Sequence, residues 1–116
     1  MEYRAKTYNI SCTVRDQEYT LYTCPDNCRS HMNLLYIANG STTTPAISVE
    51  WERADGSHMH ILGDKNLTAG EFIQWSGAYI VFEPGDRMIA TPTSHASPHV
   101  DILCTVEEYF LASRTY

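Results

Sequence analysis

Two cysteines and two histidines form the pattern in this sequence that is closest to a metal site. Three residues separate Cys24 from Cys28, which lies within the spacing range of zinc-binding cysteines. His58 and His60 alternate along an expected strand, so both rings project from one face. A strong zinc signal needs a second cysteine pair, and residues 25–27 are typical of an ordinary turn. We therefore expect no metal and no other cofactor, with these four side chains as incomplete candidates.

The cysteines also raise the question of disulfides. Cys12, Cys24, Cys28 and Cys104 allow three pairings if they are oxidised. Four cysteines in 116 residues fall short of the density of a small secreted disulfide scaffold. Free, partly buried thiols are the favoured interpretation, and a Cys24–Cys28 disulfide becomes the better one in an oxidising environment.

Catalytic motifs are missing from the sequence. It contains no Gly-x-Ser-x-Gly elbow, no His-Glu-x-x-His and no glycine-rich phosphate loop. The acid pairs Glu50/Glu52 and Glu107/Glu108 have the composition of a glycosidase couple, but acids on the outer face of a strand are usually just solvated. We expect no enzymatic activity.

Aromatic residues offer a carbohydrate-binding alternative, in which rings stack on sugars. Trp51 and Trp75 lie in expected strands among apolar neighbours, so packing in the core is the better interpretation. The three Asn-x-Ser/Thr sequons, at Asn9, Asn39 and Asn66, are read as polar strand edges and turns.

Charge and hydropathy exclude two classes of partner. The chain has 8 Lys and Arg against 14 Asp and Glu, a net charge of −6, and its basic residues never form a run. Nucleic-acid binding needs a concentrated basic surface, so we expect none. No apolar stretch is long enough for a membrane span, so we expect no membrane partner. The N-terminus lacks the apolar region of a secretory signal, so the chain is either an intracellular product or one whose signal has been removed, and the starting Met favours the former.

The elements that position these residues are short strands. Val, Ile, Thr, Tyr, Phe and Trp recur in runs broken by turn residues, and no helical periodicity is sustained. The expected strands are Lys6–Val14, Glu18–Cys24, Met32–Ala38, Ala46–Arg53, His58–Leu62, Glu71–Trp75, Ala78–Glu83, Arg87–Thr93 and Val100–Phe110. This pattern predicts an all-β fold, a single antiparallel, jelly-roll-like β-sandwich that spans residues 1–116.

Turn chemistry predicts the connections. Asp55-Gly56 indicates a hairpin, and a three-residue loop that pairs Trp51 with Ile61 sorts the flanking residues by polarity. The apolar face then holds Val49, Trp51, Met59 and Ile61, and the polar face holds Glu50, Glu52, His58 and His60. Ser76-Gly77 is expected to form a second hairpin turn.

An ordered series of such elements resembles the small β-structured proteins of tailed-bacteriophage virions. The resemblance covers Tyr19–Tyr109. It rests on the order of six segments: Tyr19–Pro25, Asn33–Gly40, Ile47–Trp51, Leu67–Glu71, Phe82–Asp86 and Ile102–Glu108. The chain departs from that pattern at Cys24–Cys28, where a plain proline turn is expected.

The resemblance implies a non-enzymatic virion part, located in the virion and assembled in the host cytoplasm. A capsid decoration or cement protein is the first expectation, and a neck, tail or baseplate component is the alternative. Other virion proteins would be its partners, and a homo-oligomer is expected, with a trimer as the first guess. The ends 1–8 and 111–116 would contact partners through Tyr3, Tyr8 and Tyr116, because tyrosine suits interfaces.

Overall fold

The computed structural model describes residues 3–95 and 97–111, and it confirms the all-β fold. No helix among these residues is long and apolar enough to cross a membrane. The eight strands are β1 (Tyr3–Cys12), β2 (Tyr19–Thr23), β3 (Cys28–Asn39), β4 (Ala46–Glu52), β5 (His58–Asn66), β6 (Phe72–Phe82), β7 (Arg87–Pro92) and β8 (Val100–Phe110).

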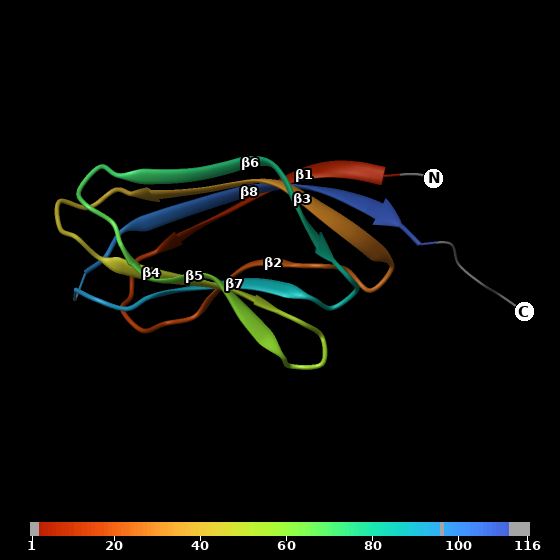
Figure 1. The fold of residues 1–116 in the computed structure, drawn as a ribbon, viewed down its shortest axis with the longest axis horizontal. Coiled ribbons are helices and arrows are strands. Elements are labelled where there is room, and N and C mark those ends of the chain that lie inside the picture. The colour runs from red at the N-terminus through yellow and green to blue at the C-terminus, as the bar shows by residue number, and fades with distance from the viewer. Residues whose placement is uncertain (1–2, 96, 112–116) are drawn as a thin grey trace, which may run out of the picture.

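The strands form two antiparallel sheets that pack face to face (Figure 1). Sheet A has the order β1-β8-β3-β6, and sheet B has the order β2-β7-β4-β5. Successive strands therefore alternate between the sheets in most places, which is the two-Greek-key arrangement of a jelly roll. The predicted jelly-roll-like sandwich is confirmed.

The connections gather at two opposite ends of the sandwich (Figure 1). Segments 40–45 and 67–71 meet residues 93–95 and 97–99 at one end, where the Gly40 amide donates to the His99 carbonyl at 2.8 Å. Segments 24–27, 53–57 and 83–86 lie at the other end, close to the start of β1 and the end of β8. There the Cys24 amide donates to the Asp86 carbonyl at 2.9 Å.

Strict alternation of side chains builds the core between the sheets. Along β8 every second residue from Val100 to Glu108 is buried, and the residues between them are partly or fully exposed. This period of two places one row of side chains between the layers and the other on the outer face of sheet A. Four members of the inward row are apolar and the fifth is Glu108.

The predicted hairpin at Ser76-Gly77 is wrong. The two strands expected on either side of it form the single strand β6, which pairs with β3 on both sides of a bulge. The register changes from Leu34 opposite Ser76 to Met32 opposite Ile80, so residues 77–79 lie opposite the single residue 33 as a bulge. A glycine inside a strand often marks a bulge, and here the strand continues through Gly77 without a turn.

The β4–β5 hairpin has the predicted three-residue loop, but the predicted pairing of Trp51 with Ile61 is wrong. Trp51 lies opposite Met59, and the Arg53 amide donates to the Ser57 carbonyl at 2.7 Å, so the loop is residues 54–56. Gly56, at φ 92°, supplies the left-handed residue that ends such a loop. Because the register moved by two positions, the predicted faces are unchanged.

Two strand boundaries differ from the prediction in a way that matters for the site. β3 begins at Cys28 instead of Met32, which places the second cysteine inside a strand. β1 begins at Tyr3 instead of Lys6, and Tyr3 lies opposite Tyr109 in β8. Most of segment 1–8 is therefore a paired strand of sheet A, while residues 112–116 fall outside the described residues.

Candidate interaction surface

The four metal candidates do not come together. Cys24 and Cys28 flank the turn between β2 and β3, whereas His58 and His60 lie on β5, at the opposite edge of sheet B from β2. Among the residues that the structure describes, no group of three or more His, Cys, Asp or Glu side chains is placed to hold a metal ion.

The two histidines instead flank one acid on the outer face of sheet B. His58 Nδ1 lies 3.3 Å from Glu50 Oε2, and His60 Nε2 lies 3.0 Å from Glu50 Oε1. Glu52 pairs with Arg87 on the same face, at 2.9 Å from Arg87 Nε. These contacts fit the predicted polar face of the β4–β5 hairpin. Both oxygens of the Glu50 carboxylate already have a histidine partner.

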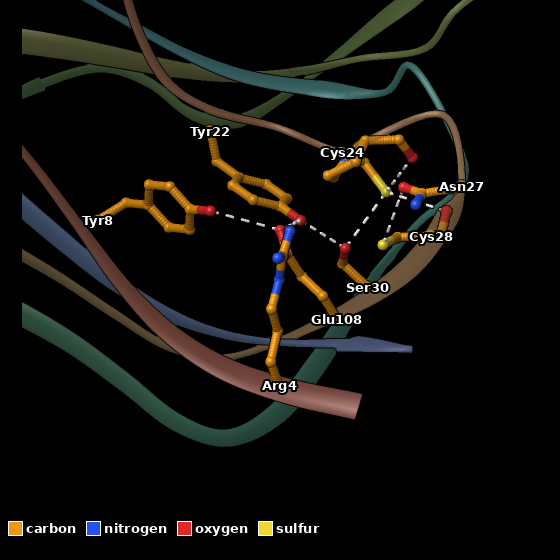
Figure 2. Close-up of polar contacts among 9 residues, drawn as sticks. Arg4, Tyr8, Tyr22, Cys24, Asn27, Cys28, Ser30 and Glu108 are labelled. Atoms are coloured by element: carbon orange, nitrogen blue, oxygen red, sulfur yellow. Dashed lines mark hydrogen bonds and ion pairs between the residues drawn. The ribbon is translucent and has the colours of Figure 1, made fainter. Parts of the chain in front are cut away.

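A buried carboxylate, Glu108, organises a polar cluster between the sheets (Figure 2). Its side chain is fully buried, and Arg4 Nε donates to Oε1 at 2.6 Å. The Tyr22 hydroxyl donates to Oε2 at 2.7 Å and lies 2.5 Å from the Ser30 hydroxyl. Strands β1, β2, β3 and β8 thus meet at one acid, and the Arg4–Glu108 pair links the first strand to the last.

The charge of Glu108 is retained inside the fold. Burial by itself raises the pKa of this carboxyl, but hydrogen bonds from Tyr22 and Arg4, together with the Arg4 charge, outweigh it and hold the pKa below its ordinary value. The interpretation of Glu107/Glu108 as solvated outer-face acids is wrong for Glu108. The alternation that begins at Val100 was the available signal, since it points position 108 inward.

The four cysteines are free and buried. Cys24 Sγ lies 3.2 Å from the Ser30 hydroxyl and donates to the Cys28 carbonyl at 3.4 Å, while Cys28 Sγ donates to Asn27 Oδ1 at 3.5 Å (Figure 2). Each thiol next to the turn therefore has an oxygen partner. The sequence favoured free thiols over a disulfide, and the cysteines are free in this structure.

The other two cysteines lie on adjacent strands without being cross-strand neighbours. Cys12 is opposite Val100, and Cys104 is opposite Tyr8. Four residues along a strand correspond to about 13 Å, well beyond the reach of a disulfide. Cys12 and Cys104 therefore act as small apolar core residues.

Thiol reactivity tests this placement. Burial raises the pKa of both Cys12 and Cys104 to about 12. A shift of that size leaves roughly a thousandth of the usual thiolate, which is the reactive form. We expect these thiols to react with an aromatic disulfide reagent about a thousandfold more slowly in the native protein than in concentrated urea, measured by absorbance at mildly alkaline pH. Rapid native labelling of either thiol would contradict the structure.

One side of the sandwich is open. On the side of β1 and β2, the rings of Tyr8 and Tyr22 close the gap between the sheets, with their centroids 5.0 Å apart. On the side of β5 and β6, an apolar cleft of about 290 Å³ enters between the layers. Its lining residues are all apolar: Met32, Leu34, Leu35, Ile61, Trp75 and Ile80.

Apolar side chains are exposed along the two edge strands of this open side. Trp75 faces the cleft yet is 38% exposed, and Met59, on the same face as the core residue Trp51, is 56% exposed. On the outer face of β6, Phe72 is 58% and Val81 41% exposed. We call Met59, Ile61, Phe72, Trp75, Ile80 and Val81 the open-side patch.

The tyrosines expected to contact partners lie in three different situations. Tyr3 is exposed on the outer face of sheet A and stacks on Tyr109, with ring centroids 5.4 Å apart. Tyr8 is half-buried against the core, and its hydroxyl lies 3.4 Å from Glu108 Oε2. Tyr116 lies outside the described residues. Tyr3 is therefore the one of these whose ring is available at the described surface.

The two tryptophans differ in environment. Trp51 packs against the core, with its ring edge-on to Phe82 and the Arg53 guanidinium 5.3 Å from the ring centroid. The prediction of core packing is confirmed for Trp51. It is wrong for Trp75, because β6 is an edge strand and nothing in the described chain covers its ring on the open side.

Comparison with known proteins shows similarity of fold alone. No protein-family model matches the sequence, and no curated protein is similar to it in sequence. A chain in the acid-stable capsid of Helicobacter pylori bacteriophage KHP30 has a TM-score of 0.57 and 11% identity, over 99% of this chain and 98% of that one.

Two further solved structures share the fold. A protein of the Bacillus endospore appendages, described as disulfide-linked pili, has a TM-score of 0.52 and 14% identity, over 95% of this chain and 89% of that one. PirA has a TM-score of 0.53 and 15% identity, over 88% and 94% of the two chains. The expected resemblance to phage virion proteins is thus supported at the level of a shared β architecture.

Proposed function

We propose that this chain is a non-enzymatic structural protein of a virus particle, most specifically a capsid decoration or cement protein that docks on the assembled shell. The observation that carries the proposal is the match to the phage KHP30 capsid chain, which spans nearly the whole of both chains. The same jelly roll, at the same size and without an added domain, serves there in a capsid.

The surface supports a binding role over a chemical one. In the described part of the chain several acids are engaged in ion pairs, among them Glu50, Glu52 and Glu108, and no metal-binding group is assembled. The open-side patch and the exposed ring of Tyr3 instead offer apolar contact area. Repeated copies of such a block would convert weak contacts into firm attachment to a symmetric shell.

The carbohydrate-binding alternative has less support. A sugar site needs an exposed ring beside polar groups that bind hydroxyls. Trp75 is exposed, but the cleft that it lines is formed by apolar residues, and Trp51 is packed against Phe82. Free buried thiols are compatible with assembly in a reducing host cytoplasm, as the virion role implies.

The proposal is tested by locating the chain in purified particles. Particles of the virus whose genome encodes it are banded on a density gradient and separated into heads and tails, and peptide mass spectrometry measures its copy number in each fraction. We expect the chain in the heads at a fixed ratio to the major capsid protein.

The fractions separate the alternatives. Presence in the tail fraction alone would replace the decoration role by the neck, tail or baseplate role. Absence from both fractions, with the chain left in the soluble lysate, would overturn the virion assignment.

A further inference from the structure

We infer that the open-side patch is where a second copy of this chain docks, so that two copies associate side to side through β5 and β6. The inference rests on the proposed structural role and names a partner for it. The patch brings together an unpaired strand edge, exposed apolar side chains and a cleft that reaches the core.

The edge strand β6 lacks most of the protection that exposed edges carry. Soluble proteins guard long edge strands with charged side chains, prolines or bulges, because a bare edge pairs with other chains. None of the 11 residues of β6 is charged and none is proline. The bulge at residues 77–79 is the one protective feature that β6 has. We therefore expect another chain to pack against the free edge of this strand.

The exposed area matches what a dimer needs. Aromatic side chains present about 150–250 Å² each, so Phe72 and Trp75, at 58% and 38% exposure, leave on the order of 200 Å² uncovered. With Met59, Val81 and the partly exposed isoleucines, the six side chains together expose roughly 400 Å² along the β6 edge and the mouth of the cleft, which is within the size range of functional patches. Two facing copies would bury about 800 Å², close to the roughly 900 Å² of apolar area in a standard interface.

The net negative charge of the chain favours contact between identical copies through apolar surface, such as the side of β5 and β6. Each chain carries a net charge of −6, so two copies repel wherever their acids face each other. The patch holds no acid, and the cleft behind it is lined by apolar residues alone. A two-fold contact in which the patch meets itself therefore brings apolar side chains of the two copies together, and a dimer replaces the trimer as the first assembly to test.

The test is the mass of the wild-type chain and of two matched valine variants by light scattering and sedimentation over a range of concentrations. Val81→Lys places a charge in the patch, whereas Val14→Lys places it in the loop 13–18, at a valine that is 51% exposed. We expect a wild-type dimer of twice 13.2 kDa, at least tenfold weaker association for Val81→Lys, and no change for Val14→Lys. Phe72→Lys should repeat the effect of Val81→Lys.

Urea unfolding verifies that each variant is folded, since both substituted valines are already exposed. A wild-type chain that stays monomeric up to about 1 mM, or an oligomer that both patch variants leave intact, would overturn the inference. A monomer that still bands with heads would overturn the self-docking alone. A patch-dependent dimer that is absent from particles would overturn the virion role alone.

Discussion

Replacing Glu108 with alanine is expected to lower the free energy of unfolding by about 3 kcal/mol. The substitution removes a fully buried carboxylate that accepts hydrogen bonds from Arg4 and Tyr22, and it leaves a cavity between the sheets. Breaking a buried charged pair typically costs about 3–5 kcal/mol, and the partial exposure of Arg4, at 44%, places this case at the lower end. Urea denaturation measures the difference.

Glu107 is the matched control, since it is the neighbouring residue with the same side chain on the outer row of β8. Glu107→Ala should change the free energy of unfolding by less than about 0.5 kcal/mol. Glu108→Gln, which keeps the shape and loses the charge, should fall between the two alanine variants. Equal effects of Glu107→Ala and Glu108→Ala would show that the buried cluster contributes nothing.

The same carboxylate predicts a dependence of stability on pH. The pKa of Glu108 is lower in the folded chain than in the unfolded chain, where a glutamate titrates near pH 4.3. Its contribution is therefore complete above about pH 4.3 and is lost as the pH falls through the folded pKa. The stability gap between the wild type and Glu108→Gln should be constant at neutral pH and shrink in acid, and a gap that widens in acid would reverse the assigned sign.

Replacing Asn39 with alanine is expected to cost about 3 kcal/mol as well. Asn39 Nδ2 donates to the carbonyls of Thr43, Leu67 and Thr68 at 2.9–3.1 Å, and Oδ1 accepts from the Ser41 amide at 2.9 Å. One buried amide thus joins the end of β3 to two connections, 40–45 and 67–71. Its removal leaves the buried Leu67 carbonyl and the part-buried carbonyls of Thr43 and Thr68 without this donor, and a buried group left unpaired costs about 1–3 kcal/mol.

Asn39→Asp is the sharper variant, because the side chain keeps its size while its donors become acceptors that face three carbonyl oxygens. We expect a loss at least as large as that of Asn39→Ala, measured by urea unfolding. Asn66→Asp is the control, since Asn66 is an exposed residue in another sequon, and it should change stability by less than about 0.5 kcal/mol. A tolerated Asn39→Asp would contradict the buried network.

These two residues show how far local sequence reasoning reached. Asn39 was expected to lie at a polar strand edge or turn, and Glu108 to be a solvated acid, because both residue types are usually exposed. Each is buried by contacts with residues far along the chain: Asn39 with Leu67 and Glu108 with Arg4, which is 104 positions away. No local pattern contains that information.

The sequence by itself determined the β class, the jelly-roll-like sandwich, the limits of β8 and the three-residue loop before β5, because alternation and turn chemistry are set by neighbouring residues. The tertiary structure alone decided that β6 runs through Ser76-Gly77, that Trp75 stays exposed and that one side of the sandwich is open. The physical reason is that a strand's edge, and the cover of a side chain on it, depend on which distant strands lie beside it. That arrangement is set by long-range pairing between strands within each sheet and by the packing of the two sheets.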